Sequence, residues 1–122
     1  MEHAPGFLKL VRDAKKGVRE TSVAEIKARL ARGDRFFLVD VREDGEWSTG
    51  RIRGAMHLGR GIIERDIEKT IPEKGAEIVV YCGGGFRSAL AAESLGKMGY
   101  SRVLSMDGGW RGWVEAQGPV EK

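Results

Sequence analysis

Short runs of strand-forming residues alternate with helical patterns along this chain of 122 residues. The runs predict five strands, at residues 18–21, 36–39, 54–58, 78–81 and 102–105. The runs at 36–39 and 78–81 are continuously apolar, which is typical of strands covered on both faces of a parallel sheet. Helical patterns at 23–32, 64–69 and 88–98, and a last one after Gly108-Gly109, separate or follow the strands. This alternation predicts an α/β domain of three layers, with helices flanking a mostly parallel five-stranded sheet.

The helix predicted at 23–32 has clear signals at both ends. Ser22 followed by Glu25 forms a capping box, in which each side chain bonds a free backbone amide of the first turn. Gly33 is a C-terminal stop signal because glycine tolerates the left-handed conformation found there. In the last predicted helix, the spacing of Trp110 and Trp113 places both rings on one face, and we expect both to anchor the core.

The first residues of the chain form a separate segment. Residues 1–17 combine a short apolar stripe with several lysines and arginines, and predict an N-terminal helical extension ahead of a domain at 18–120. A basic amphipathic helix either packs on its own domain or binds a membrane surface or a partner. We expect the first of these.

Composition excludes several classes of function. The formal charge of +3 is too small to indicate a nucleic-acid-binding protein, and no apolar run approaches the ~20 residues of a membrane helix. The single cysteine cannot form an internal disulfide, and no apolar stretch of signal-peptide type occurs near residue 1. We therefore expect a cytoplasmic protein with no membrane or nucleic-acid partner, no cofactor and no metal site.

That cysteine, Cys82, lies where the strand at 78–81 ends and the helix at 88–98 follows. Glycines leave room for an anion, and the free amides and dipole of a helix start favour negative charge. A cysteine in such a place can have its pKa lowered from about 8.5 to roughly 3.5–7.5, which makes it a nucleophilic thiolate at neutral pH. The candidate site therefore consists of Cys82 as the catalytic residue and a substrate-binding loop of Gly83, Gly84, Gly85, Phe86, Arg87 and Ser88.

Residues 82–88 resemble the active-site loop of the rhodanese sulfurtransferase family. Three further segments resemble the family's motifs in the expected order, namely 38–47, 50–57 and 107–110. Arg51 and Arg53 depart from the family pattern, which often has His and Pro there, and we expect these positions to be structural. The resemblance spans nearly the whole chain and implies a rhodanese-like domain.

The resemblance implies a sulfurtransferase of ping-pong type. Cys82 would take a sulfane sulfur from a small donor such as thiosulfate or a persulfide, and pass it to a thiol or cyanide acceptor. A sulfur-relay protein is a further expected partner. Arg87 would either hold the donor's anionic oxygens or close the loop through hydrogen bonds. Asp40 and Arg42, at the end of the strand at 36–39, are expected to support the site structurally, in a network with Glu46.

Two other functions remain open. Phosphatases and arsenate reductases also use a cysteine and an arginine, but the rhodanese-fold phosphatases have five residues between them. Here Gly83 to Phe86 make only four, and the loop contains no acidic residue to act as general acid. A non-catalytic interaction or redox-sensing module is the other alternative. His57 is a general-base candidate on residue type alone, but a histidine in a strand is more often a hydrogen-bonded structural residue.

Overall fold

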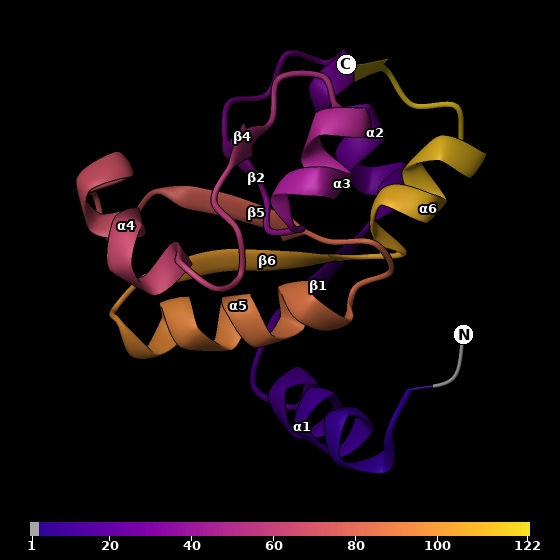
Figure 1. Ribbon diagram of the computed structural model, residues 1–122. Helices are drawn as coiled ribbons and strands as arrows, with labels where there is room; N and C mark the ends of the chain where they lie inside the picture. The colour runs from indigo at the N-terminus through magenta and orange to yellow at the C-terminus, as the bar shows by residue number, and fades with distance from the viewer. Residues whose placement is uncertain (1–2) are drawn as a thin grey trace.

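The computed structural model describes residues 3–122, and a parallel sheet of five strands forms its centre (Figure 1). The strands lie in the order β1-β6-β5-β2-β4, and all neighbours in this sheet are parallel. The predicted α/β fold with a five-stranded central sheet is thus confirmed. The strand bounds are β1 Arg19–Ser22, β2 Phe37–Asp40, β4 Met56–His57, β5 Glu77–Tyr81 and β6 Arg102–Asp107.

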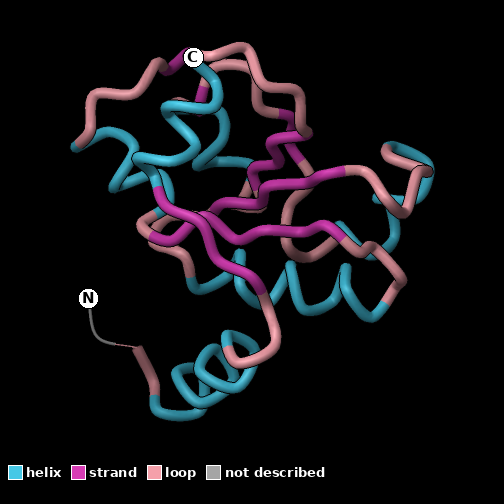
Figure 2. Tube along the Cα trace, turned by 180° about the vertical axis from the view of Figure 1, so that it is seen from behind, coloured by secondary structure: helices cyan, strands magenta, loops and turns pink. Residues whose placement is uncertain are grey.

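Helices cover both faces of this sheet (Figures 1 and 2). On one face lie α4 Ile63–Thr70 and α5 Phe86–Lys97, and on the other α2 Val23–Ala31, α3 Asp44–Thr49 and α6 Gly109–Glu115. Successive side chains of a strand point to opposite faces, so the central strand β5 supplies both cores. Ile78 and Val80 pack with α4 and α5, whereas Val79 and Tyr81 pack with α2 and α6.

The start of α2 confirms one half of the predicted capping box. The Ser22 hydroxyl accepts a hydrogen bond from the Glu25 amide at 3.0 Å, and the helix begins at Val23. Within residues 3–122 the Glu25 side chain makes no return bond to the Ser22 amide, so the second half is wrong. Gly33 follows the helix with a φ of +81°, a conformation that glycine adopts without steric cost.

Helix α1, Pro5–Lys15, lies against α5 on the side that faces away from the sheet (Figure 1). Val11 and Ala14 are its buried residues, and the remainder of the helix is half-buried or exposed. Within residues 3–122, no helix combines the length and the apolar character needed to cross a lipid bilayer. Residues 1 and 2 of the predicted extension lie outside the described residues.

Some short elements have no counterpart among the predicted ones. Helix α3 has six residues, none of them buried, and Glu43 and Glu46 form a capping box at its start. Strands β3 Arg51–Ile52 and β7 Val120–Glu121 form a separate antiparallel pair at the edge of the domain.

The two tryptophans of α6 differ in their surroundings. Trp113 is fully buried, and its indole nitrogen donates a hydrogen bond to the Pro119 carbonyl at 2.9 Å. Trp110 is only half-buried, at the edge of the same core, and its ring lies 4.7 Å from the Arg42 guanidinium. The expectation of two core anchors is therefore confirmed for Trp113 and only partly for Trp110, because α6 starts at the rim of the sheet.

Candidate active site

The candidate site lies at the carboxyl edge of the parallel sheet, directly after its central strand. Cys82 follows β5, and α5 begins four residues later at Phe86. Gly85 caps that helix with a φ of +110°, which an L side chain rarely adopts. A Cβ at Gly85 would also approach the Asp107 carboxylate at 3.2 Å. Glycine at this position therefore permits both the sharp turn and the close packing of the loop.

The loop directs backbone amides at the Cys82 sulfur. The amides of Gly85 and Ser88 lie 3.2 and 3.3 Å from Sγ, and the Ser88 hydroxyl lies 3.6 Å from it. Burial raises the pKa of the Cys82 thiol, but these hydrogen bonds outweigh burial and leave its pKa below the ordinary value. Donors that stabilise a thiolate stabilise other anionic sulfur at the same place.

A second buried hydroxyl lies behind the first. The Ser88 and Ser105 hydroxyls are 2.8 Å apart, and both side chains are fully buried. When Ser105 donates to Ser88, the Ser88 proton is available for the sulfur. Ser105, which comes from β6, was not among the predicted site residues because its hydroxyl reaches the sulfur only through Ser88.

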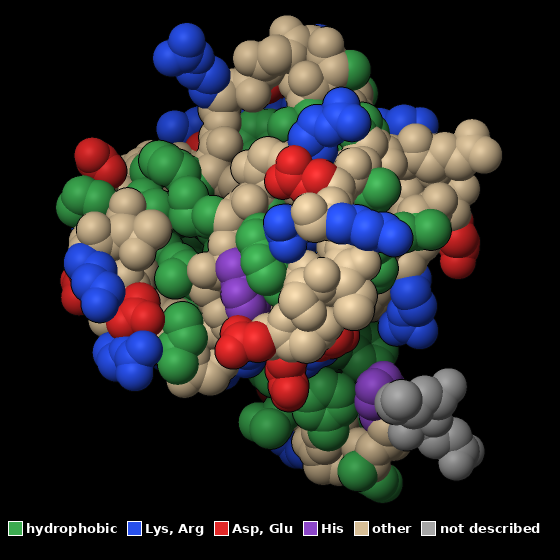
Figure 3. Space-filling view, turned by 45° about the horizontal axis from the view of Figure 1, so that its top comes forward, with side chains coloured by type: hydrophobic (Ala, Val, Ile, Leu, Met, Phe, Trp, Pro, Cys, Tyr) green, Lys and Arg blue, Asp and Glu red, His purple; other side chains and the backbone are tan. Residues whose placement is uncertain are grey.

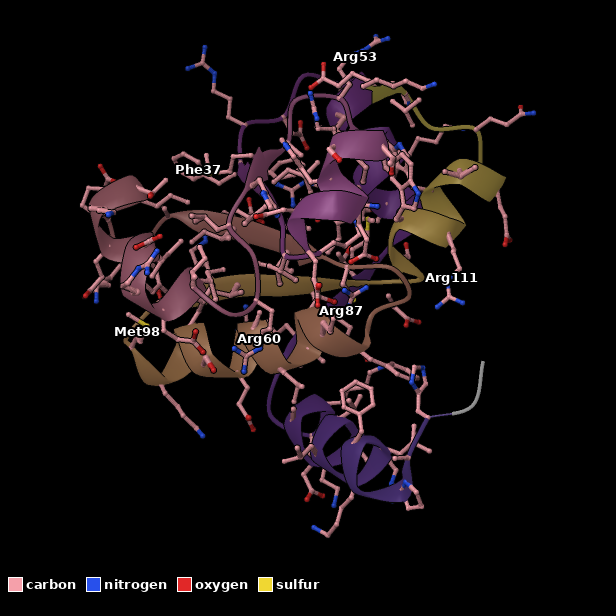
Figure 4. All side chains as sticks on the ribbon, in the orientation of Figure 1. Phe37, Arg53, Arg60, Arg87, Met98 and Arg111 are labelled. Atoms are coloured by element: carbon pink, nitrogen blue, oxygen red, sulfur yellow. The ribbon has the colours of Figure 1, made fainter. Side chains whose placement is uncertain are left out.

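Arg87 is held by a carboxylate from another element. Its guanidinium nitrogens donate to both oxygens of Glu46 in α3, at 2.7 and 3.1 Å. The Arg87 hydrogen bond lowers the pKa of the Glu46 carboxyl to about 2, against the opposing effect of partial burial. The bidentate pair joins α3 to the start of α5, and Figure 4 shows Arg87 between these two helices.

Asp40 and Arg42 form a buried pair at the end of β2. The Arg42 side chain donates to both Asp40 oxygens at 2.8–3.1 Å, and to the Gly50 carbonyl at 2.6 Å. Both side chains are at most 3% exposed, so the pair fixes the chain between β2 and β3. The expected network of these two residues with Glu46 is wrong in one respect, since Glu46 bonds Arg87 and the Glu43 amide instead.

Helix α6 holds the loop from the other side. The Trp110 amide donates to the Cys82 carbonyl at 2.7 Å, and the Arg111 amide to the Gly83 carbonyl at 3.0 Å. Gly109 makes this contact possible, because a Cβ there would collide with the Cys82 carbonyl. The first turn of α6 and the cysteine loop thus satisfy each other's free backbone groups.

An open cleft of about 910 Å³ lies over the loop. Its floor contains Cys82, Gly83 and Gly84, and its walls contain residues from α3, α6 and the N-terminal segment. Figure 3 shows hydrophobic side chains exposed at the lower end of one face of the molecule, where α1 lies. The lining residues that were not predicted as substrate-binding residues are His3, Ala4, Phe7, Glu46, Trp110 and Arg111.

His57 lies outside this cleft. Its Nε2 is 2.8 Å from the Arg42 carbonyl oxygen, and its ring stacks on Trp47 at 4.9 Å. These contacts are those of a structural residue, which is the role expected for it.

Comparisons with known proteins agree with this geometry. The Rhodanese-like domain family matches residues 22–116. A sulfurtransferase from Allochromatium vinosum is 34% identical, over 84% of this chain and 94% of its own length. A thiosulfate sulfurtransferase from Glaesserella parasuis is also 34% identical, over 69% of this chain and 76% of its own.

Two solved structures resemble this fold. A rhodanese-like domain from Anabaena has a TM-score of 0.76 at 29% identity, covering 84% of this chain and 77% of its own. A protein of unknown function from Rhodopseudomonas palustris, described as a possible tyrosine phosphatase, has a TM-score of 0.89 at 29% identity. That match covers 99% of this chain and 98% of the other, and so includes α1. From the family match and the sulfurtransferase relatives together, the chain belongs to the rhodanese-like sulfurtransferase family.

Proposed function

We propose that the protein transfers sulfane sulfur through a persulfide on Cys82. The Cys82 thiolate attacks the outer sulfur of a donor such as thiosulfate, and sulfite leaves with the electrons of the broken S–S bond. The product is Cys82 persulfide. An acceptor thiolate or cyanide then attacks the outer sulfur, and Cys82 leaves as thiolate. Each step breaks one bond to sulfur and forms another.

The observation that carries this proposal is the convergence of hydrogen-bond donors on the Cys82 sulfur. These donors lower the pKa of the nucleophile and supply a preorganised environment for the anionic persulfide. Gly83 and Gly84 have no side chains to occupy the space above the loop. We assign to Arg87 the role of closing the loop, because its guanidinium is bonded to both carboxylate oxygens of Glu46.

The donors and acceptors are proposed by chemical class. Thiosulfate or a persulfide is the donor, and a thiol or cyanide the acceptor. A sulfur-relay protein as physiological partner stays a prediction, because a cleft of this openness accepts either a small molecule or an exposed thiol.

Mass spectrometry of the protein after incubation with thiosulfate tests the proposal. We expect the mass of one added sulfur atom, located on Cys82 and removed by a reductant. The Cys82→Ser variant should keep its fold and gain no sulfur. Thiosulfate:cyanide or thiosulfate:thiol activity that survives in Cys82→Ser would contradict the mechanism.

Mass spectrometry and a phosphatase assay together separate the alternatives. A non-catalytic module would form no persulfide that an acceptor can discharge. A phosphatase is the function suggested by the description of the Rhodopseudomonas palustris protein, and it would hydrolyse an aryl phosphate through Cys82. Two observations argue against a phosphatase. Only four residues separate Cys82 from Arg87, and the Arg87 guanidinium is already bonded to Glu46.

A further inference from the structure

Helix α1 brings a cation to the active-site loop from outside the matched family segment, which begins at residue 22. We infer that Lys15, at the end of α1, is a positioning residue for sulfur transfer. Its ammonium offsets the Glu20 and Asp107 carboxylates beside the loop and thereby keeps the Cys82 sulfur in its anionic form. The inference rests on the proposed sulfur transfer and adds a group that tunes the reactivity of the same site.

The Lys15 side chain joins three elements of the domain. Its ammonium nitrogen lies 3.3 Å from a Glu20 oxygen in β1 and 3.7 Å from an Asp107 oxygen at the end of β6. The same nitrogen lies 5.4 Å from the ring centre of Phe86, the first residue of α5. A cation at this distance from an aromatic face is attracted to it. These contacts hold the ammonium at the carboxyl edge of the sheet, next to the start of α5.

The two carboxylates lie on the face of the sheet that carries the buried hydroxyls of the site. Glu20 is the register partner of Ser105 in the parallel pair of β1 and β6. Ser105 and Asp107 are two residues apart in β6 and therefore point to the same face, where the Ser105 hydroxyl meets Ser88 of α5. Glu20 and Asp107 thus place negative charge beside the hydrogen-bond chain that reaches Cys82.

The Asp107 carboxylate packs directly against the loop. A Cβ on Gly85 would lie 3.2 Å from an Asp107 oxygen, and the Gly85 amide lies 3.2 Å from Sγ of Cys82. Gly85 therefore contacts both the carboxylate and the sulfur. A negative charge near a thiol disfavours its thiolate form, so an uncompensated Asp107 would oppose the donors that stabilise the Cys82 thiolate.

The remaining charged groups around the loop do not offset these two carboxylates. Among residues 3–122, Lys15 is the only lysine or arginine at ion-pair distance from Glu20 or Asp107. The other charged or titratable side chains around the loop are His3, the bonded pair of Asp40 and Arg42, Glu43 and Glu46 of α3, Arg87 of α5 and Arg111 of α6. Compensation at this corner of the site therefore depends on α1.

Alkylation of Cys82 by iodoacetamide tests the inference, because this reagent is uncharged and its rate follows the thiolate fraction. Lys15→Gln removes the ammonium and should leave about two- to threefold less thiolate at pH values below the pKa of Cys82. The effect is modest because water reaches the Asp107 side chain, which is 64% exposed. Lys15→Arg keeps the charge and should behave as the wild type.

The matched control is Lys16→Gln, which removes the same charge from the next residue of the chain. The Lys16 side chain is 80% exposed, and its ion-pair partner is Asp13 at 3.7 Å. We expect this variant to keep the thiolate fraction of the wild type. A difference between Lys15→Gln and Lys16→Gln therefore reports the place of the charge and not the net charge of the protein.

Asp107→Asn provides an independent test with the opposite sign. Removing this carboxylate should raise the thiolate fraction about twofold, whether or not any Lys15 variant folds. The double variant Lys15→Gln/Asp107→Asn should return to the wild-type fraction, because the two lost charges act in opposite directions. At about 0.5 M salt the difference between wild type and Lys15→Gln should shrink, since salt screens partly exposed charges. Loosened packing of α1 would produce neither result.

The outcomes separate the inference from the proposed function, because alkylation needs no sulfur donor. An unchanged thiolate fraction in folded Lys15→Gln, or in Asp107→Asn, overturns the inference. A loss in Lys15→Gln that neither Asp107→Asn nor salt reduces also overturns it. If thiosulfate adds sulfur to Cys82 and these charges have no effect, only the inference fails. If thiosulfate adds no sulfur, the proposed function fails, and with it the role of Lys15 in transfer.

Discussion

Replacing Ser88 by alanine isolates the contribution of one hydroxyl to the reactivity of Cys82. The substitution removes the donor at 3.6 Å from Sγ and leaves the Gly85 and Ser88 amides in place. A hydrogen bond to a charged group contributes about 1.5–3 kcal/mol, and the long sulfur–oxygen distance favours the lower end. About 1.4 kcal/mol corresponds to one pKa unit, so we expect the pKa of Cys82 to rise by roughly one unit.

The pH dependence of alkylation by iodoacetamide measures this pKa directly. The rate of sulfur transfer is a poorer measure, because a less acidic thiol is also intrinsically more nucleophilic. Ser105→Ala removes the buried hydroxyl that bonds Ser88 and leaves the Ser88 donor itself in place, so the pKa of Cys82 should rise less than in Ser88→Ala. An unchanged pKa in Ser88→Ala would refute the assignment of the hydroxyl as a direct thiolate donor.

Three further predictions concern the rest of the site. Arg87→Lys should lower kcat/KM for thiosulfate by at least about tenfold, because lysine cannot form the two parallel bonds to Glu46; activity equal to wild type would contradict the loop-closing role. The pair should stabilise the protein above pH ~4.5 and lose this effect as the pH falls toward the Glu46 pKa of about 2. Acid unfolding of Glu46→Gln should therefore depend less on pH in that window than acid unfolding of the wild type. Identical curves for the two proteins would contradict this contribution of the pair. Gly109→Ala should lower the free energy of unfolding by at least about 2 kcal/mol, because φ is +52° and a Cβ there would meet backbone atoms. Gly61→Ala, where a Cβ would have open space around it, should not lower this free energy. Thermal melts compare the two variants.

The cysteine loop was predictable because its signals are local. A buried strand, three glycines and a helix start occupy adjacent positions, and chain order alone places Cys82 at the carboxyl edge of the sheet. Ser22 and Gly33 likewise mark the ends of α2 through contacts within a few residues.

The partners that the sequence did not reveal are distant in the chain or leave no periodic signal. Glu46 and Arg87 are 41 residues apart, and α3 buries none of its residues, so its pattern of hydrophobic positions contains no helix period. Phe7 reaches the cleft only because α1 crosses α5, which is a tertiary contact. Trp110 has the spacing of a core residue, and only the position of α6 at the rim exposes part of its ring.

The backbone bonds from α6 to the loop also have a consequence for how the protein is made. Gly85 and Ser88, which form hydrogen bonds to the sulfur, precede residue 89, yet the Cys82 and Gly83 carbonyls find their partners at residues 110 and 111. A nascent chain in which Cys82 has just emerged from the ribosome therefore still lacks the Trp110 and Arg111 amides that fix its loop. The thiol is translated early and acquires its reactive surroundings late, so incomplete chains carry the cysteine without its activation.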